Sequence, residues 1–316
     1  MIFLGIDAGG TKTTAVAADL KGEDIRTSHG APGAISAIGV NGVDSLITDL
    51  LRDLNIYDLL DRLQAATFGF SGVGREDVKQ KVEEEIKKIG ITDFRVITDG
   101  ELLHYSAFGE SDGILIEAGT GSVCINRKNN LLTQIGGWGY LLGDEGGGYQ
   151  IGRDAIRSAL AEKEHNLPIS KLSEEIMNFY GVEKRQEIMN IVYAADSAQK
   201  IISSSAFTVC ELAVQGYSGA LTIVEDAATH LFAILQTALE NYAAGDLIKI
   251  ACAGSILTKD SPVLDFFNKK LDDIGYNYEL VNISIEPAAA GVLYAVNSSG
   301  EEVSEQLMNS LKGVTF

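Results

Sequence analysis

A short pattern that occurs twice constrains the fold of this chain more than any other feature of its sequence. Residues 5–11 and residues 115–121 both read apolar, apolar, acidic, Ala, Gly and then a turn of Gly and Thr. Apolar runs precede and follow each turn, so both segments predict two strands joined by a glycine-rich turn. A similar strand at Leu247–Ala253 ends in Gly254-Ser255. The repeat predicts two similar lobes.

Strands and helices alternate along the chain between these segments. Apolar residues at helical spacing cover 42–54 and Glu76–Ile89, and short apolar runs at 65–70 and Phe94–Thr98 predict strands. This alternation predicts an α/β protein whose helices cover the faces of a sheet. The middle of the chain is mostly helical, with predicted helices at 153–163, Lys171–Tyr180, 198–215 and 221–242.

Length and charge limit the number of domains and the classes of partner. Single cores stop growing at about 250–300 residues, so 316 residues predict two domains. The chain carries 25 basic and 44 acidic residues, a net charge of −19. So negative a surface repels phosphate backbones and anionic lipid, and neither nucleic acid nor a membrane is an expected partner. Backbone N–H groups can still bind a small anion.

The cysteines and the apolar runs exclude further classes. Cys124, Cys210 and Cys252 are odd in number and widely spaced, which argues against a disulfide framework and against a metal site made by this chain alone. The chain has no uninterrupted apolar stretch of about 18 residues, and Asp7 interrupts its apolar N-terminus. We therefore expect a cytoplasmic protein without a membrane span.

The two glycine-rich turns are candidate phosphate sites. Glycines let the backbone approach a phosphate closely, and consecutive N–H groups can form a nest for an anion. One Gly-Gly turn alone is more often an ordinary hairpin, but two such turns can bind one polyphosphate from both sides. The candidate residues are Gly9, Gly10, Thr11, Lys12 and Thr13 in the first turn and Gly119, Thr120, Gly121 and Ser122 in the second.

Two aspartates follow or end apolar strands. Asp7 lies beside the first turn, where a carboxylate suits a hydrated Mg²⁺ ion. Asp99 stands between a strand and a helix, and the local sequence alone favours a helix N-cap. The functional alternative is a general base that takes the proton of a substrate hydroxyl. Both interpretations place Asp99 at the carboxyl end of a strand, where α/β proteins bind ligands.

The segment 136–148 is the most unusual part of the chain. It contains seven glycines, the only tryptophan, Trp138, and the acidic pair Asp144-Glu145. A floppy loop is the simplest explanation, but the apolar residues beside Trp138 disfavour it. Glycines that approach a ligand, an aromatic face for a sugar ring and carboxylates for its hydroxyls together predict a carbohydrate site.

In this order the segments resemble the superfamily of actin, the heat-shock chaperone ATPases and the sugar kinases. GIDAGGTKT resembles its first phosphate motif, EAGTGS its second and ACAGSIL its adenosine motif. GGWGYLLGDEGGGYQIGRDAI is similar to the signature of the N-acetylglucosamine kinase and BadF/BcrA-type ATPase family. The resemblance implies two ribonuclease-H-like lobes around a nucleotide and sugar cleft, 1–107 with 288–316 on the sugar and phosphate side and 108–287 on the ATP side.

The resemblance also implies an activity and a role for each candidate residue. It implies a kinase that transfers the γ-phosphoryl group of ATP to a hydroxyl of N-acetylglucosamine or a related sugar, with Mg²⁺ as a cofactor. A homodimer is left open. Asp99 would be the catalytic base, Asp7 would face the metal, and the residues of both turns would bind phosphates. Gly254 and Ser255 would lie by the adenosine, and Gly137, Trp138 and Asp144 by the sugar.

Two departures from the family pattern leave the sugar open. Ala34 occupies the position where the family's sugar kinases commonly carry an asparagine that binds sugar hydroxyls. Val123 follows GTGS, where the mammalian N-acetylglucosamine kinases have an asparagine. Glucosamine, a hexose, N-acetylmuramate and 2-keto-3-deoxygluconate therefore stay as alternatives. Two rivals belong to other classes: an ATPase activator of a CoA dehydratase, which shares an iron–sulfur cluster between subunits, and a nucleotide-dependent binding or chaperone protein.

Overall fold

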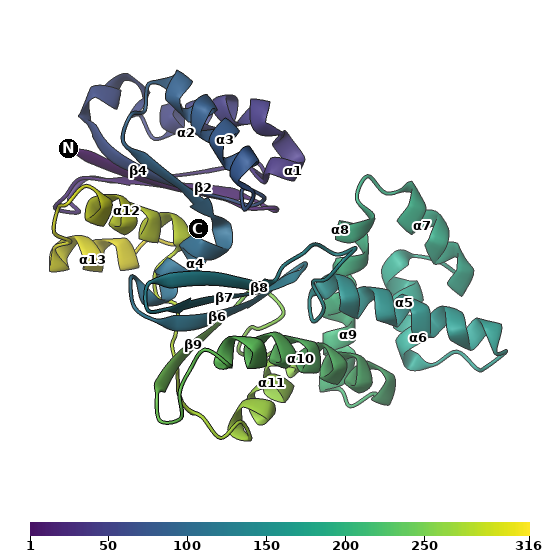
Figure 1. Cartoon of the computed structure of the whole chain (residues 1–316). Helices are drawn as coiled ribbons and strands as arrows, with labels where there is room; N and C mark the ends of the chain where they lie inside the picture. The colour runs from purple at the N-terminus through teal and green to yellow at the C-terminus, as the bar shows by residue number, and fades with distance from the viewer. The chain divides into compact units, whose positions relative to one another are not determined.

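The computed structural model describes residues 1–316, which divide into two compact units. Unit 1 comprises Met1–Ser111 and Asn282–Phe316, and unit 2 comprises Asp112–Val281. Each unit contains one five-stranded sheet with helices packed against it (Figure 1). The prediction of an α/β chain with two similar lobes is confirmed.

Three adjacent strands in the sheet of unit 1 run parallel to one another. The order of its strands is β3-β2-β1-β4-β5; β1 pairs antiparallel with β2, and β2 with β3, whereas β1, β4 and β5 are parallel. The carboxyl ends of the three parallel strands therefore lie side by side. The strands are β1 (Ile2–Ala8), β2 (Thr13–Ala18), β3 (Ile25–Gly30), β4 (Leu63–Phe70) and β5 (Phe94–Thr98).

Helices cover both faces of this sheet (Figure 1). One face packs on α2 (Val43–Asp53) and α3 (Glu76–Ile89), whose buried residues join one apolar cluster with alternate residues of β1. The short helix α1 (Ile35–Ile38) precedes them. The other face packs on α12 (Pro287–Ser298) and α13 (Glu305–Lys312). Helix α4 (Asp99–Phe108) contributes Tyr105 to this second cluster.

The sheet of unit 2 repeats the topology of the first. Its order is β10-β9-β6-β7-β8, in which β6, β7 and β8 are antiparallel neighbours and β6, β9 and β10 are parallel. β9 therefore corresponds to β4 and is not a third copy of the opening strand, as the sequence pattern had suggested. The strands are β6 (Gly113–Ala118), β7 (Ser122–Lys128), β8 (Leu131–Gly136), β9 (Leu247–Ala253) and β10 (Asn277–Leu280).

Unit 2 has a larger helical part. Helices α10 (Ser218–Leu239) and α11 (Pro262–Asp272) share one buried cluster with residues of β6 and β9. The single helix predicted for 198–215 is wrong, because the chain breaks into α8 and α9 at Ser204-Ser205. The Ile202 carbonyl there approaches Gly152 of α5 so closely that a Cβ on Gly152 would lie 2.1 Å from its oxygen. The remaining helices are α5 (Gly148–Glu164), α6 (Lys171–Tyr180), α7 (Ile188–Ala194), α8 (Ala198–Ser203) and α9 (Ala206–Val214).

Helix α10 is long and apolar enough, by length and composition only, to cross a membrane. In unit 2 it packs along the sheet instead, and Val224, Leu231 and Leu235 are fully buried in the same cluster as Ile116 of β6. A buried helix can be apolar around much of its circumference, so this composition is also that of a core helix.

The close packing of α12 on β1 depends on Gly5. A Cβ at Gly5 would lie 2.1 Å from the carbonyl oxygen of Ala288 and 2.6 Å from the backbone nitrogen of Val292. No side chain fits in that space, and the small residues at the start of α12 complete the contact. Helix α12 is thereby held against β1 only two residues before Asp7.

We predict that Gly5→Ala lowers the free energy of unfolding by about 2–4 kcal/mol, because α12 must move off the sheet. The matched control is Gly10→Ala, since a Cβ at Gly10 meets no atom within 4 Å. Its expected effect is within about 0.5 kcal/mol. Urea unfolding of both variants checks this, and equal destabilisation would contradict the packing described for Gly5.

Candidate functional site

The turn between β1 and β2 holds four of the five residues predicted for the first phosphate site. The Gly9 N–H donates to the Lys12 carbonyl over 3.1 Å and closes the turn. Gly10, Thr11 and Lys12 are exposed at its tip, where their N–H groups are accessible to an anion. Thr13 is different: it is buried in β2 and its hydroxyl donates to the Ala31 carbonyl over 2.7 Å.

The turn between β6 and β7 is one residue shorter and is attached to a helix. The Gly119 N–H donates to the Gly121 carbonyl over 2.9 Å. The carbonyls of Gly119 and Thr120 accept from the N–H groups of Gly148 and Tyr149, the first residues of α5, over 2.8 and 2.9 Å. The turn therefore lies at the N-terminus of a long helix, where the helix dipole favours negative charge.

The glycine run before α5 serves packing within the protein. A Cβ at Gly147 would lie within 2.7 Å of backbone atoms of Gly121, and a Cβ at Gly146 would lie 2.5 Å from Leu231 of α10. The sequence-based interpretation assigned these glycines to a ligand. The structure corrects it at these two positions, because the backbone approaches its own second turn and α10.

Asp7 and Asp99 belong to neighbouring strand ends in unit 1. Asp7 is the next-to-last residue of β1, Asp99 follows β5, and only β4 lies between those strands. The interpretation of Asp99 as a helix N-cap is wrong: Thr98 is the cap, and its hydroxyl oxygen accepts from the Glu101 N–H over 3.0 Å. Since the cap is supplied by another residue, the Asp99 carboxylate is left to accept from the Gly100 N–H over 3.0 Å.

The local electrostatics make both acids hard to ionise. Burial, the negative charge of Asp99 and that of Glu286 raise the pKa of Asp7 to about 7, although Lys12 opposes them. Burial also raises the pKa of Asp99, and hydrogen bonds from the Ser71 side chain and the Gly100 N–H oppose this rise. Glu286 precedes α12 and is a member of this acidic group that the sequence did not reveal.

Oxygen ligands with net negative charge suit a divalent cation such as Mg²⁺. The Asp7 carboxylate is of this type and accepts no hydrogen bond within the chain. A bound cation would offset the repulsion among Asp7, Asp99 and Glu286. No group of three or more His, Cys, Asp or Glu side chains in the structure is placed to hold a metal ion. Asp7 is therefore a candidate for a single carboxylate ligand, which suits Mg²⁺ because this ion is commonly bound by one or two carboxylates together with phosphate oxygens.

Two of the three predicted sugar residues, Trp138 and Asp144, line a cavity of about 310 Å³. Trp138 is 68% exposed at its mouth. Asp144 accepts from the Gly139 N–H over 3.0 Å, and burial raises the pKa of its carboxyl. His230 of α10 also lines this cavity, and no local sequence signal could have assigned it. Gly137 stands next to the cavity, with Val123 and Gln134 too close to allow a side chain there.

The structure brings this cavity together with the second turn. Ser122 lines the cavity, and its hydroxyl donates to the Glu145 carbonyl over 2.6 Å. A Cβ at Gly121 would lie 2.2 Å from a carboxylate oxygen of Asp144. Asp144, which the sequence predicts to bind the sugar, is therefore an immediate neighbour of Gly121, which it predicts to bind phosphate.

Gly254 and Ser255 follow the carboxyl end of β9, which is parallel to β6, the strand that leads into the second turn. Both are exposed and follow the last residue of β9. Gly254 has a φ of 89°, and a Cβ there would lie 2.2 Å from the carbonyl oxygen of Ala118, the last residue of β6. The candidate adenosine segment thus adjoins the strand that leads into the second turn.

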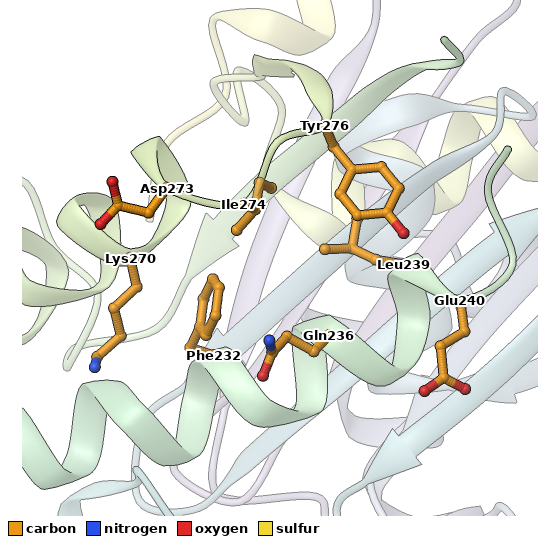
Figure 2. A pocket seen from close by; sticks show the side chains of 8 residues that line it. All are labelled: Phe232, Gln236, Leu239, Glu240, Lys270, Asp273, Ile274 and Tyr276. Carbon is orange, nitrogen blue, oxygen red and sulfur yellow. The ribbon is translucent and has the colours of Figure 1, made fainter. Parts of the chain in front are cut away.

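A larger cavity of about 480 Å³ lies elsewhere in unit 2 (Figure 2). It is bordered by the last turns of α10 and α11 and by residues just before β10. It therefore lies near the amino end of β10, away from the strand ends that carry the second turn and Gly254. It contains none of the predicted site residues. Its lining residues are Phe232, Gln236, Leu239, Glu240, Lys270, Asp273, Ile274 and Tyr276.

The three cysteines are structural in their surroundings. Cys124 is fully buried, and Cys210 and Cys252 pack against the same apolar cluster. Burial raises the pKa of all three thiols, to about 11 for Cys210 and about 12 for Cys252. Thiolates, the form that binds iron or zinc, are therefore disfavoured.

Comparison with known proteins agrees with this geometry. The model of the BadF/BadG/BcrA/BcrD ATPase family matches residues 4–296. The chain is 26% identical over 285 residues to an N-acetylmuramic acid/N-acetylglucosamine kinase of Clostridium acetobutylicum, covering 89% of this chain and 92% of that protein. It is 25% identical over 320 residues to an N-acetyl-D-glucosamine kinase of Dictyostelium discoideum, with 94% and 98% covered.

A solved structure shares the fold. A Chromobacterium violaceum protein described as an N-acetylglucosamine kinase superposes with a TM-score of 0.74 at 21% identity, covering 92% of this chain and 98% of that one. At this identity the likeness supports the fold and leaves the activity to the site.

We predict that Asp7→Asn stabilises the metal-free protein by an amount that grows with pH. An unfolded Asp ionises near 3.8 but folded Asp7 only near 7, so the wild type loses stability as the pH rises through this range. Asn does not ionise. The gain should be small at pH 4 and on the order of 1–3 kcal/mol at pH 8, measured by urea unfolding with a chelator. Equal gains at both values, or the same gain for exposed Asp58→Asn, would contradict the assignment.

Proposed function

The chain belongs to the BadF/BadG/BcrA/BcrD ATPase family, and we propose that it is an ATP-dependent sugar kinase that phosphorylates a hydroxyl of N-acetylglucosamine or a closely related sugar in the cytoplasm. One observation carries this proposal. Each unit has a glycine-rich turn after its first strand, and the two first strands, β1 and β6, are equivalent in the two sheets. The curated kinases matched above support the sugar as substrate.

Each unit contributes to nucleotide binding in this proposal. The N–H groups of Gly9, Gly10 and Thr11, with Lys12, bind phosphate oxygens from unit 1. In unit 2 the corresponding phosphate-binding candidates are Gly119, Thr120 and Gly121, which lie at the N-terminus of α5. Gly254 and Ser255 receive the adenosine. When bound near Asp7, Mg²⁺ would neutralise charge on the phosphate oxygens.

Asp99 is the general base of the proposed reaction. Its carboxylate takes the proton of the sugar hydroxyl as that oxygen attacks the γ-phosphorus of ATP. The new O–P bond forms while the bond from the γ-phosphorus to the bridging oxygen breaks, and ADP leaves with those electrons. The raised pKa of Asp99 suits this role, because a base whose pKa lies nearer neutrality accepts a proton more readily.

The sugar is bound mainly through Trp138, Asp144 and Gly137. An exposed indole offers an apolar face to a pyranose ring, and Asp144 accepts hydrogen bonds from its hydroxyls. The CoA-dehydratase activator is less well supported, because buried thiols with raised pKa values make poor cluster ligands. ADP release assayed with N-acetylglucosamine, glucosamine, N-acetylmuramate, hexoses and 2-keto-3-deoxygluconate tests the proposal, and no transfer to any of these would overturn it.

We predict that Asp99→Asn lowers kcat by on the order of 10²–10⁴-fold, the usual contribution of a general base. ATP binding, measured by calorimetry, should be unchanged because the amide keeps the shape of the carboxylate. Asp93→Asn, exposed just before β5, is the control and should turn over normally. Unimpaired turnover of Asp99→Asn would show that another group takes the proton.

We predict that Trp138→Ala raises the KM for the sugar about tenfold or more, because the apolar surface that the indole would bury against the bound sugar is lost. The KM for ATP should stay near the wild-type value. Tyr193→Ala, an exposed aromatic side chain of α7, serves as the control. An effect on the ATP constant in place of the sugar constant would place the 136–148 loop at the nucleotide.

A further inference from the structure

Ser71 lies directly after the carboxyl end of β4, the middle one of the three parallel strands of unit 1. It follows Phe70, the last residue of β4, and β4 lies between β1 and β5. Phe70 pairs with Ala8 on one side and with Thr98 on the other. One residue further along, Ser71 therefore lies between the start of the first turn and Asp99.

Three interactions tie Ser71 to three different segments. Its N–H donates to the Ala8 carbonyl over 3.0 Å, and its carbonyl accepts from the Ile35 N–H over 2.9 Å. Its side chain adjoins the Asp99 carboxylate, as the strand register requires, and lowers the pKa of that carboxyl group, which burial raises. Ser71 thus connects the phosphate turn, the segment that contains Ala34, and the proposed base.

We infer that Ser71 is a positioning residue for Asp99. Its hydroxyl and the Gly100 N–H hold the carboxylate in one rotamer, so that a free lone pair stays directed at the sugar hydroxyl. This inference rests on the proposed function, in which Asp99 takes the proton. It assigns to Ser71 an effect on the chemical step and none on nucleotide binding.

The fold itself does not require this hydroxyl. Both backbone interactions of Ser71 are available to any residue with an N–H and a carbonyl group. In unit 2 the equivalent position, directly after β9, is Gly254, which has no side chain. The Ser71 side chain is therefore dispensable for building such a strand end, and Asp99 is the partner that accounts for it.

Kinetics of Ser71→Ala and Ser71→Thr test the inference. Removing one hydrogen bond to a charged group should lower kcat by about 5–30-fold, with the KM for ATP and the melting temperature near wild type. Ser71→Thr keeps the hydroxyl and should recover most of the lost kcat. A wild-type kcat for Ser71→Ala, or a Thr variant as slow as the Ala variant, would overturn the inference.

A double-mutant cycle shows whether Ser71 acts through Asp99. Adding Ser71→Ala to Asp99→Asn should cause no further loss of kcat, because the carboxylate that Ser71 positions is already gone. A further loss equal to that of Ser71→Ala alone would mean that the hydroxyl acts independently. If Asp99→Asn is slow and Ser71→Ala is not, only the inference fails; if Asp99→Asn is unimpaired, the assignment of the base fails with it.

Discussion

The confinement of carboxyl groups at the carboxyl ends of the parallel strands β1 and β5 is the constraint on which the rest of unit 1 depends. Asp7 and Asp99 are both half-buried, which makes the ionisation of each carboxyl group costly, and the negative charge of Asp99 adds to the cost at Asp7. The chain offsets this cost locally, with Lys12 for Asp7 and with the Gly100 N–H and Ser71 for Asp99. In the proposed function this charge is neutralised from outside, by a cation at Asp7 and by the substrate proton at Asp99.

The two units use one topology for different chemistry. Both have a glycine-rich turn after the first strand, and in both a candidate site residue directly follows the fourth strand, Ser71 after β4 and Gly254 after β9. Unit 1 adds acids to this frame, with Asp99 after its fifth strand. Unit 2 has Gly254 where unit 1 has Ser71, and there the backbone approaches so closely that no side chain fits. The proposed base Asp99 thus belongs to unit 1, and the proposed sugar residues Trp138 and Asp144 belong to unit 2.

Much of the fold could be predicted from the sequence, because buried parallel strands are continuous apolar runs that local pattern reveals. Helix α3 and strands β5 and β9 have the predicted bounds. Strands β3 and β8 were missed because each is an edge strand, largely unburied, whose polar residues read as turn or loop. The break between α8 and α9 depends on contact with α5, which no local pattern contains.

The candidate site was only partly predictable, because part of it depends on contacts between segments that are distant in the sequence. The turns, the two aspartates and Trp138 could be selected from the sequence by residue type and position, and their roles are proposals. The role of Thr98 as a cap depends on a hydrogen bond one residue away from the expected position. Ser71, Glu286 and His230 become visible only through strand register and helix packing, which bring distant segments of the chain together.

The attachment of α5 to the second turn has a mechanical consequence. Its first two residues are hydrogen bonded to Gly119 and Thr120, and α5 in turn packs on α6, α8 and α9. A shift of the second turn would therefore either break these two hydrogen bonds or carry the first residues of α5, and the packing of α5 on those helices, along with it.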